Sequence, residues 1–335
     1  MHAGKSYTLP EFLFWTRRSI YVLAGLAVLP VVLHAFVGLT WLVVPWSVVF
    51  LLGTTVALSA GFKNLQTFNR MQDAQQAWTS IVSTSRVWGT LCRDGVADRE
   101  RARELAQRHL AWLAALRHQM RQVKPWETAS RAANAEYMRD HRVEEREETL
   151  ESALARHLAW DEAAPVLTSA NPALAVLALQ SRQLAALSAQ GGVTPAVYAD
   201  LQGRLREFHD LQGRSERIKN FPYPRQHAFV NTLFVRILCV LLPFGMVAEF
   251  AELDALVGGW AKGHMIWLGV PLALLITWMY ASLDRVGEST ENPFEGSAND
   301  VPITQLSRQV ETEYADLFGE AGAAPPRRAA NAIAL

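Results

Sequence analysis

The sequence predicts an all-α membrane protein in which four transmembrane helices are continuous with a large helical cytoplasmic domain. No Asp, Glu, Lys or Arg lies between Arg18 and Lys63, and this run of roughly 43 residues is about twice the length that crosses a bilayer. Two further apolar stretches lie at 228–250 and 263–283. The roughly 160 residues between the two pairs of spans have helical periodicity and no convincing alternating strand pattern.

The long apolar run divides into two spans, near 18–37 and 45–62. Pro45 suits the first turn of the second helix, and Trp41 and Trp46 suit the membrane interface. The second stretch passes from apolar to polar residues without a Pro or a terminal Gly, which predicts that one helix leaves the membrane and continues into water. A cleaved signal peptide is the alternative for the N-terminus, but the apolar run is too long for one.

Four spans place both termini on the same side of the membrane. Basic residues gather beside the spans on that side, whereas the two short loops on the other side carry almost none, so the positive-inside rule makes the termini cytoplasmic. The basic residues are Lys5, Arg17, Arg18, Lys63, Arg70, Arg217, Lys219, Arg225 and Arg285. The two cysteines, Cys92 and Cys239, fit reduced thiols and no disulfide framework.

Five segments follow from this pattern. We expect a cytoplasmic N-terminal segment with the first two spans (1–62), a helical cytoplasmic domain (63–225), spans three and four (226–283), a cytoplasmic C-terminal segment (284–318) and a disordered tail (319–335). Within the cytoplasmic domain, helices are predicted over 99–122, 143–161, 171–190 and 195–219, the last two opened by Asn-Pro and Thr-Pro.

Enzyme templates are absent, so we expect no catalytic residues, and we expect no cofactor and no nucleic-acid partner. The scattered histidines His109, His118, His141 and His157 favour ordinary surface or core positions over a metal site. The acidic run from Glu144 to Glu151 favours a solvated helix face over a cation-attracting vestibule.

Two features inside the spans allow two interpretations each. Arg236 either faces the protein interior, an aqueous cavity or an anion, or extends to the cytoplasmic interface. Thr54, Leu58 and Phe62 are four residues apart and therefore form one stripe on the second helix. Their spacing alone favours a packing seam against the other spans over a pore lining.

Four motifs, in order around the four spans, resemble the bestrophin family, particularly its bacterial members. They are GFKNLQTFNRMQDAQQAW (61–78), LRHQMR (116–121), ERIKNFPYP with LCVLLPFG (216–224 and 238–245) and VGESTENPFEGSANDVP (286–302). The motif positions that we take as structural are Gly61, Asn64, Arg70, Trp78, Glu216, Arg217, Pro243, Glu288, Pro293, Phe294 and Asp300.

The resemblance implies a homopentameric channel of a bacterial inner membrane, conducting small monovalent ions such as chloride or other anions through a central pore. It aligns Thr54, Leu58 and Phe62 with a hydrophobic neck formed by the second spans, and Ala196 with a cytoplasmic aperture. The expected partners are therefore other copies of the chain, the lipid bilayer and the permeant ions. A cation (sodium) channel of the same fold, a non-conducting membrane scaffold and a transporter are the alternatives.

Several positions depart from the family pattern. Thr54 replaces a bulky apolar residue, which moves the expected barrier to Leu58 and Phe62. Ala196 is small, which predicts a wide exit. Gln75 stands where the family commonly has Arg, and Arg236 where an aromatic residue is usual. Glu295, Asn299 and Asp300 offer too few clustered carboxylates for a calcium site, so we expect no bound metal.

Overall fold

The computed structural model describes residues 8–128, 142–259 and 262–319, and the expected tail lies outside these ranges apart from Gly319. The chain divides into two compact units. The span unit comprises Lys5–Asn69 and Tyr223–Glu291, and the helical unit comprises Arg70–Pro222 with the segment from Asn292 onward. Each unit is described by itself.

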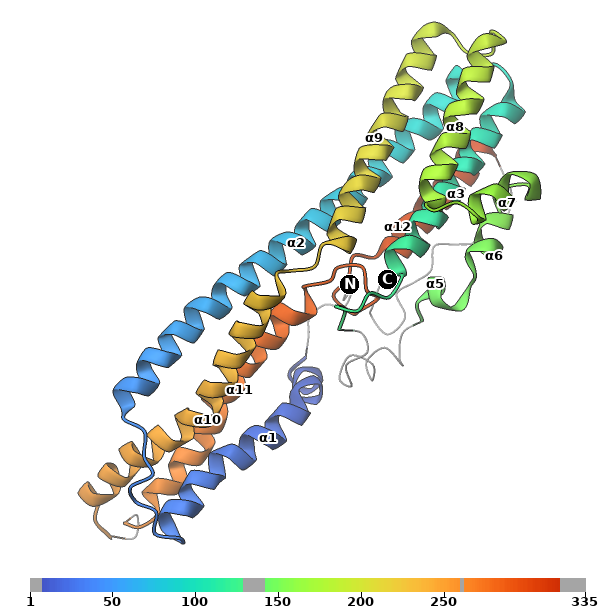
Figure 1. The fold of residues 1–335 in the computed structure, drawn as a ribbon. Coiled ribbons are helices and arrows are strands. Elements are labelled where there is room, and N and C mark those ends of the chain that lie inside the picture. Colours follow the sequence, from blue (N-terminus) through green and yellow to red (C-terminus); the bar gives the residue numbers. More distant parts are fainter. Residues whose placement is uncertain (1–7, 129–141, 260–261, 320–335) are drawn as a thin grey trace. The chain divides into compact units, whose positions relative to one another are not determined.

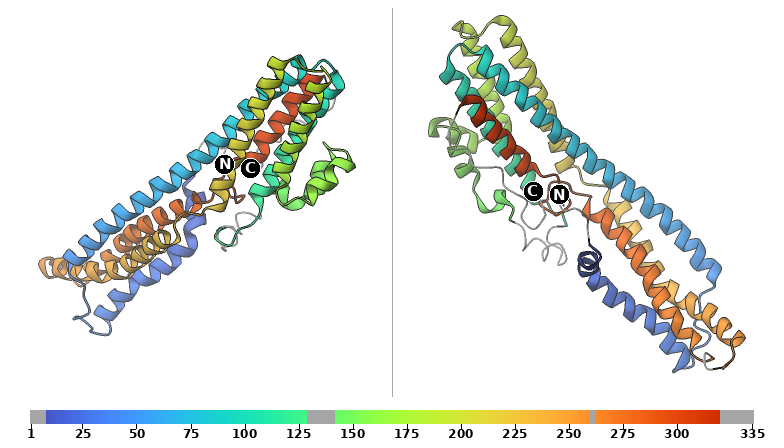
Figure 2. Two further views of the ribbon diagram at one scale, coloured as in Figure 1. Left: turned by 45° about the horizontal axis from the view of Figure 1, so that its top comes forward. Right: turned by 180° about the vertical axis from the view of Figure 1, so that it is seen from behind.

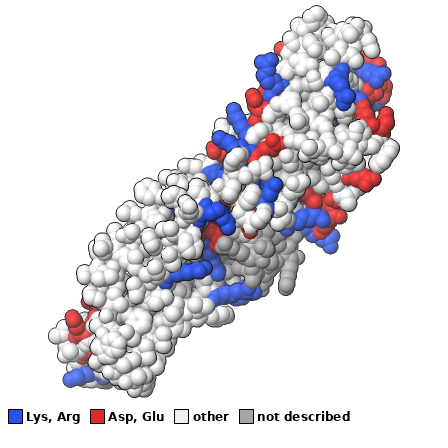
Figure 3. Space-filling view, in the orientation of Figure 1, with Lys and Arg blue, Asp and Glu red and all other residues white. Residues whose placement is uncertain are grey.

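In the span unit, α10 packs on α11, and α1 packs on both (Figure 1). These helices are α1 (Leu9–Ala35), α10 (Arg225–Leu256) and α11 (Met265–Ser289), and α2 (Trp46–Gly95) contributes its residues up to Asn69. Among the described residues, these four helices are long and apolar enough to cross a membrane. In the face shown in Figure 3, the span unit is uncharged over most of its surface. The four long apolar helices that the sequence predicted are confirmed.

The first span begins earlier than the hydropathy predicted. Helix α1 starts at Leu9, where Pro10 occupies the first turn and the backbone N–H of Thr8 donates to Glu11 Oε2 at 2.8 Å. This is a capping arrangement that hydropathy does not detect. Helix α2 runs unbroken over 50 residues, which confirms that the second span continues as one helix beyond Phe62.

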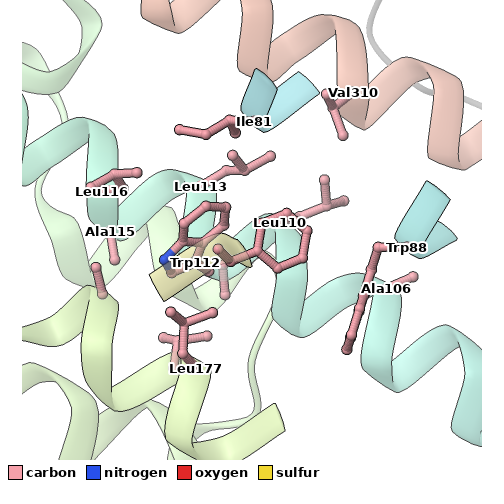
Figure 4. Packing of buried hydrophobic residues seen from close by; sticks show 14 of the residues in the cluster. Ile81, Trp88, Ala106, Leu110, Trp112, Leu113, Ala115, Leu116, Leu177 and Val310 are labelled. Carbon is pink, nitrogen blue, oxygen red and sulfur yellow. The ribbon is translucent and has the colours of Figure 1, made fainter. Parts of the chain in front are cut away.

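In the helical unit, α3 lies at the centre and packs against α8, α12, α6, α5 and α9 (Figure 2). Its helices are α3 (Arg99–Arg121), α5 (Glu144–Glu147), α6 (Leu150–Ala155), α7 (Trp160–Leu167), α8 (Pro172–Ala189), α9 (Pro195–Asn220) and α12 (Ile303–Phe318), together with the second part of α2. Figure 4 shows Trp112 of α3 among Leu110, Leu113 and Leu177 in this core. Within the described ranges, the β-structure consists of one isolated bridge between Val96 and Val193.

The helix predicted over 143–161 is wrong, because this segment forms three short helices. Glu148 takes an extended conformation at the end of α5. Thr149 then caps α6 by accepting a hydrogen bond from the backbone N–H of Ser152 at 3.2 Å. Ala159 is extended again before α7. A threonine cap in the middle of a helical pattern starts a new helix, which the periodicity alone did not reveal.

Candidate pore-lining site

The candidate neck residues share the face of α2 that its own unit leaves uncovered. Thr54 is exposed, and 61% of the Leu58 side chain and 65% of the Phe62 side chain are exposed. The opposite stripe, which includes Val56, Ala60 and Lys63, is buried. The interpretation of Thr54, Leu58 and Phe62 as a packing seam against the chain's other spans is therefore wrong.

The hydroxyl of Thr54 is turned back onto its own helix. Its Oγ1 donates a hydrogen bond to the carbonyl oxygen of Phe50 at 2.9 Å. This contact uses the hydroxyl proton and leaves the oxygen able to accept a hydrogen bond. A ring of Thr54 side chains would therefore offer water fewer donors than free hydroxyls would.

A buried ion pair anchors α2 immediately after Phe62. Lys63 Nζ lies 2.7 Å from Asp284 Oδ1 of α11, and only 4% of the lysine side chain is exposed. Asn231 of α10 donates to the same carboxylate oxygen at 2.8 Å. The sequence indicated Lys63 only as a basic residue beside a span, because its partner lies 221 residues away.

A close approach of α2 and α11 lies next to this ion pair. Asn64 Nδ2 donates to the carbonyl oxygen of Leu283 at 3.2 Å. A Cβ on Gly287 would lie 2.1 Å from Asn64 Oδ1, so a larger residue at 287 requires the helices or the Asn64 side chain to move. Nearer the middle of the span, the Tyr280 hydroxyl donates to the carbonyl oxygen of Gly53 at 3.2 Å. Three successive contacts thus fix the buried face of α2 and leave its Leu58 face open.

The other motif residues of the span unit differ in how deeply they are buried. Pro243 is buried within α10. Gly61 of α2 is exposed, and Glu288 is half-buried near the end of α11. A Cβ on Gly245, two residues after Pro243, would lie 2.8 Å from Val49 Cγ2 of α2.

In the helical unit, residues of all four motifs meet in the core and at its edge. Trp78 and Phe294 are fully buried with ring centroids 6.4 Å apart, and Pro293, which precedes Phe294, is also buried. Arg70 donates to the backbone carbonyl of Ile218. Glu216 is a shared acceptor: Gln119, Asn171 and Gln212 donate to its Oε1 at 2.8, 2.9 and 2.9 Å. Arg217, in contrast, is exposed.

The carboxylates of the last motif are already engaged by protein groups. Asp300 accepts hydrogen bonds from Arg121 Nη1 at 2.8 Å and from Ser297 Oγ at 2.5 Å. Glu295 accepts from both the backbone N–H and the hydroxyl of Thr128, each at 2.9 Å. Burial raises the pKa of Glu295 to about 7, with a further contribution from the negative charge of Asp300. This segment is therefore a hydrogen-bonded buried network.

The acidic run and the histidines also differ from free surface groups. Glu145 is buried with Arg117 Nη1 3.1 Å from its Oε1, so the expected solvated face is wrong at this position. Burial lowers the pKa of His109 to about 3, and its Nε2 pairs with Ser85 Oγ at 2.8 Å. His141 lies outside the described residues. Within the described ranges, no three His, Cys, Asp or Glu side chains are grouped to hold a metal ion.

The candidate aperture residue Ala196 is exposed in the first turn of α9, where Thr194 caps the helix. Seven-residue steps from Ala196 lead to Gly203, Asp210 and Arg217 on the same face of the helix. Asp210 and Arg217 line a groove of about 680 Å³ between α2 and α9. The other lining residues are Asp73, Gln76, Ala77, His209, Gly213, Arg214 and Ile218.

Arg236 is exposed on α10, so the interior of its own chain does not hold the guanidinium. Its neighbour Val235 is buried, as is Cys239, whose thiol contacts the Thr277 carbonyl oxygen at 3.7 Å. No hydrogen bond or ion pair links Arg236 to the part of the chain that the structure describes.

Comparison with known proteins decides the family. The profile described as "Bacterial/Fungal Bestrophin protein" matches residues 15–316. The chain belongs to the bacterial bestrophin family. It is thus a member of a channel family and not an enzyme.

Two bacterial relatives illustrate how far the sequence has diverged from known proteins. Voltage-dependent anion channel-forming protein YneE of Escherichia coli (strain K12) is 22% identical over 302 residues, which cover 90% of this chain and 84% of that protein. A voltage-dependent anion channel-forming protein of Mesorhizobium japonicum is 26% identical over 278 residues, covering 83% of this chain and 75% of its own length.

A crystal structure of a bacterial bestrophin homologue from Klebsiella pneumoniae shares the fold. It superposes with a TM-score of 0.76 at 19% sequence identity and covers 91% of this chain and 99% of that chain. The all-helical bestrophin fold predicted from the four motifs is confirmed.

Proposed function

We propose that the chain forms a homopentameric anion channel of the bacterial inner membrane, with both termini in the cytoplasm. The second spans of five copies surround a central pore. Leu58 and Phe62 form its hydrophobic neck, Thr54 lies at the outer end of the neck, and Ala196 lines the cytoplasmic aperture. Residues 63–225 and 284–318 form the cytoplasmic body.

The uncovered face of α2 carries this proposal. Leu58 and Phe62 are held outward by contacts on the opposite face at Gly53, Lys63 and Asn64. The same outward face carries the polar residues Gln66 and Asn69 one to two turns later, together with the exposed Leu65. Rings of large apolar side chains in a pore oppose conduction by excluding water.

The preference for anions is supported by the relatives, whose names describe them as anion channel-forming proteins. The neck itself has no charge with which to select the sign of an ion. The orientation is supported by the basic residues Arg17, Arg18 and Arg285, which gather at one end of the spans.

The neck is tested by recording single channels from purified protein in planar bilayers. Leu58→Ala and Phe62→Ala should each raise conductance or open probability, because the smaller side chains widen the neck and let water enter. Leu29→Ala, at an exposed position of α1, is the matched control and should leave both unchanged. The neck assignment fails if neither neck variant differs from the unmodified channel.

A further inference from the structure

Three arginines gather where the first part of α1 packs on the last turns of α11. Arg285 Nη1 donates to the carbonyl oxygen of Trp15 at 3.0 Å, and its guanidinium carbon lies 6.0 Å from the Trp15 ring centroid. Trp278 Nε1 donates to Thr16 Oγ1 at 3.0 Å, which joins the two helices one residue before Arg17. The junction thus holds Arg285 beside the α1 segment that carries Arg17 and Arg18.

The positive charge of Arg285 has no carboxylate partner at this junction among the described residues. Arg18 lies close enough for its positive charge to repel that of Arg285. The carboxylate of the adjacent Asp284 attracts Arg285, but it accepts its hydrogen bonds from Lys63, Asn231 and Thr232. Among the described residues, no carboxylate oxygen lies within 4.0 Å of the Arg285 guanidinium nitrogens. An added anion beside Arg285 would therefore supply a countercharge to its guanidinium.

Exposed apolar side chains surround these charges. The guanidinium carbon of Arg17 lies 3.7 Å above the ring of Phe14, which is 58% exposed. On α11, Leu283 and Val286 are exposed within two residues of Arg285. Trp15 and Trp278 are of the residue type that occupies the membrane interface. The surface therefore combines guanidinium groups with apolar flanks, which is the chemistry of a phospholipid with a negative headgroup.

We propose that Arg17, Arg18 and Arg285 bind the phosphate headgroup of an anionic phospholipid, whose acyl chains lie on the apolar surface of α1 and α11. Guanidinium groups suit a phosphate because their planar N–H donors pair with its oxygens. The apolar flanks distinguish a lipid from free phosphate, which would use the charges alone. This site is independent of conduction, so its test and the test of the neck can fail separately.

The test measures lipid binding to the purified full-length protein in detergent by native mass spectrometry. The probes are phosphatidylglycerol and phosphatidylcholine with identical acyl chains, and inorganic phosphate. The unmodified protein should bind phosphatidylglycerol more tightly than phosphatidylcholine. Each of Arg18→Gln and Arg285→Gln should weaken phosphatidylglycerol binding about fivefold, and the double variant about 25-fold, from the usual contribution of one basic side chain near an anionic lipid.

The matched control is the double variant Arg93→Gln with Arg142→Gln, which removes the same charge from exposed positions of the helical unit and should not change binding. Arg285→Lys keeps the charge and should retain most of the binding, which separates loss of charge from loss of folding. Equal binding of the two lipids, unchanged binding in the R18Q/R285Q variant, or complete displacement of phosphatidylglycerol by millimolar inorganic phosphate would overturn the lipid site.

Discussion

At the scale of single residues, Glu295 is the clearest case in which the surroundings of a side chain shift its pKa. Its side chain is almost fully enclosed, and its hydrogen-bond donors come from neutral Thr128. The nearby carboxylate of Asp300 has the guanidinium of Arg121 as its partner. Glu295 therefore keeps its proton to a higher pH than an ordinary glutamic acid does.

This predicts stability that falls as the pH rises. The carboxyl group titrates near 4.5 when free and near 7 in the fold, so the folded chain binds the extra proton between these values. The free energy of unfolding should fall by up to about 3 kcal/mol as the pH rises from about 4.5 to about 7. Glu295→Gln should remove most of this dependence in thermal unfolding of the purified protein, whereas Glu147→Gln, at an exposed position, should not.

Gly287 is the second residue with a specific requirement, because Asn64 occupies the space that a side chain would need. Gly287→Ala should lower the free energy of unfolding by about 1–3 kcal/mol through overpacking. Gly25→Ala on α1, where a Cβ meets no atom within 4 Å, is the control and should be neutral or stabilising. Equal melting temperatures for the two variants would contradict the close approach of α2 and α11.

At the scale of elements, the Lys63–Asp284 pair links α2 to α11, with Asn231 adding α10. Lys63→Met or Asp284→Asn should each cost on the order of 3 kcal/mol, because each leaves a buried charge without its partner. The double variant should cost clearly less than the sum of the two single variants. A thermal-unfolding cycle on the purified protein measures this coupling.

The control for the cycle is the exposed pair Arg86–Glu313, whose atoms also lie 2.7 Å apart but whose side chains are 50% and 34% exposed. Replacing either partner should cost less than about 1 kcal/mol, because water screens the charges. Additive effects at Lys63 and Asp284 would show that the pair does not link the helices.

The helices that the sequence predicted well have their start signals beside them in the chain. Asn171 and Thr194 accept hydrogen bonds from the backbone N–H groups of Leu174 and Val197, as their Asn-Pro and Thr-Pro contexts indicated. The start of a new helix at Thr149 was not predicted, because a capping threonine inside a periodic pattern looks like an ordinary helical threonine. Helix α12 was not assigned, although Val310, Tyr314 and Phe318 form its buried stripe at four-residue steps.

The candidate site was predictable only in part for a physical reason. Spacing placed Thr54, Leu58 and Phe62 on one stripe but could not tell which way the stripe faces, since that depends on contacts from α10 and α11. The family motifs indicated the outward direction. The ion pairs Lys63–Asp284 and Arg121–Asp300 join residues 221 and 179 positions apart, and no local pattern encodes such pairings.

At the scale of the whole molecule, the proposed path has a neck of large apolar residues and an exit of methyl groups. Ala196→Phe should lower the permeability to large anions relative to chloride, because five bulky rings would narrow the exit. Ala185→Phe, at an exposed position of α8, is the control of equal size and should leave relative permeability unchanged. Bi-ionic reversal potentials measure this, and identical ratios for both variants would contradict the placement of Ala196 at the exit.

The central claim is that this bestrophin conducts anions, and the reversal potential of purified protein in a bilayer with asymmetric potassium chloride tests it most directly. The account predicts unitary currents that reverse near the equilibrium potential of chloride. Reversal near the equilibrium potential of potassium, or a pentamer that carries no current even with Leu58 and Phe62 changed to Ala, would contradict it.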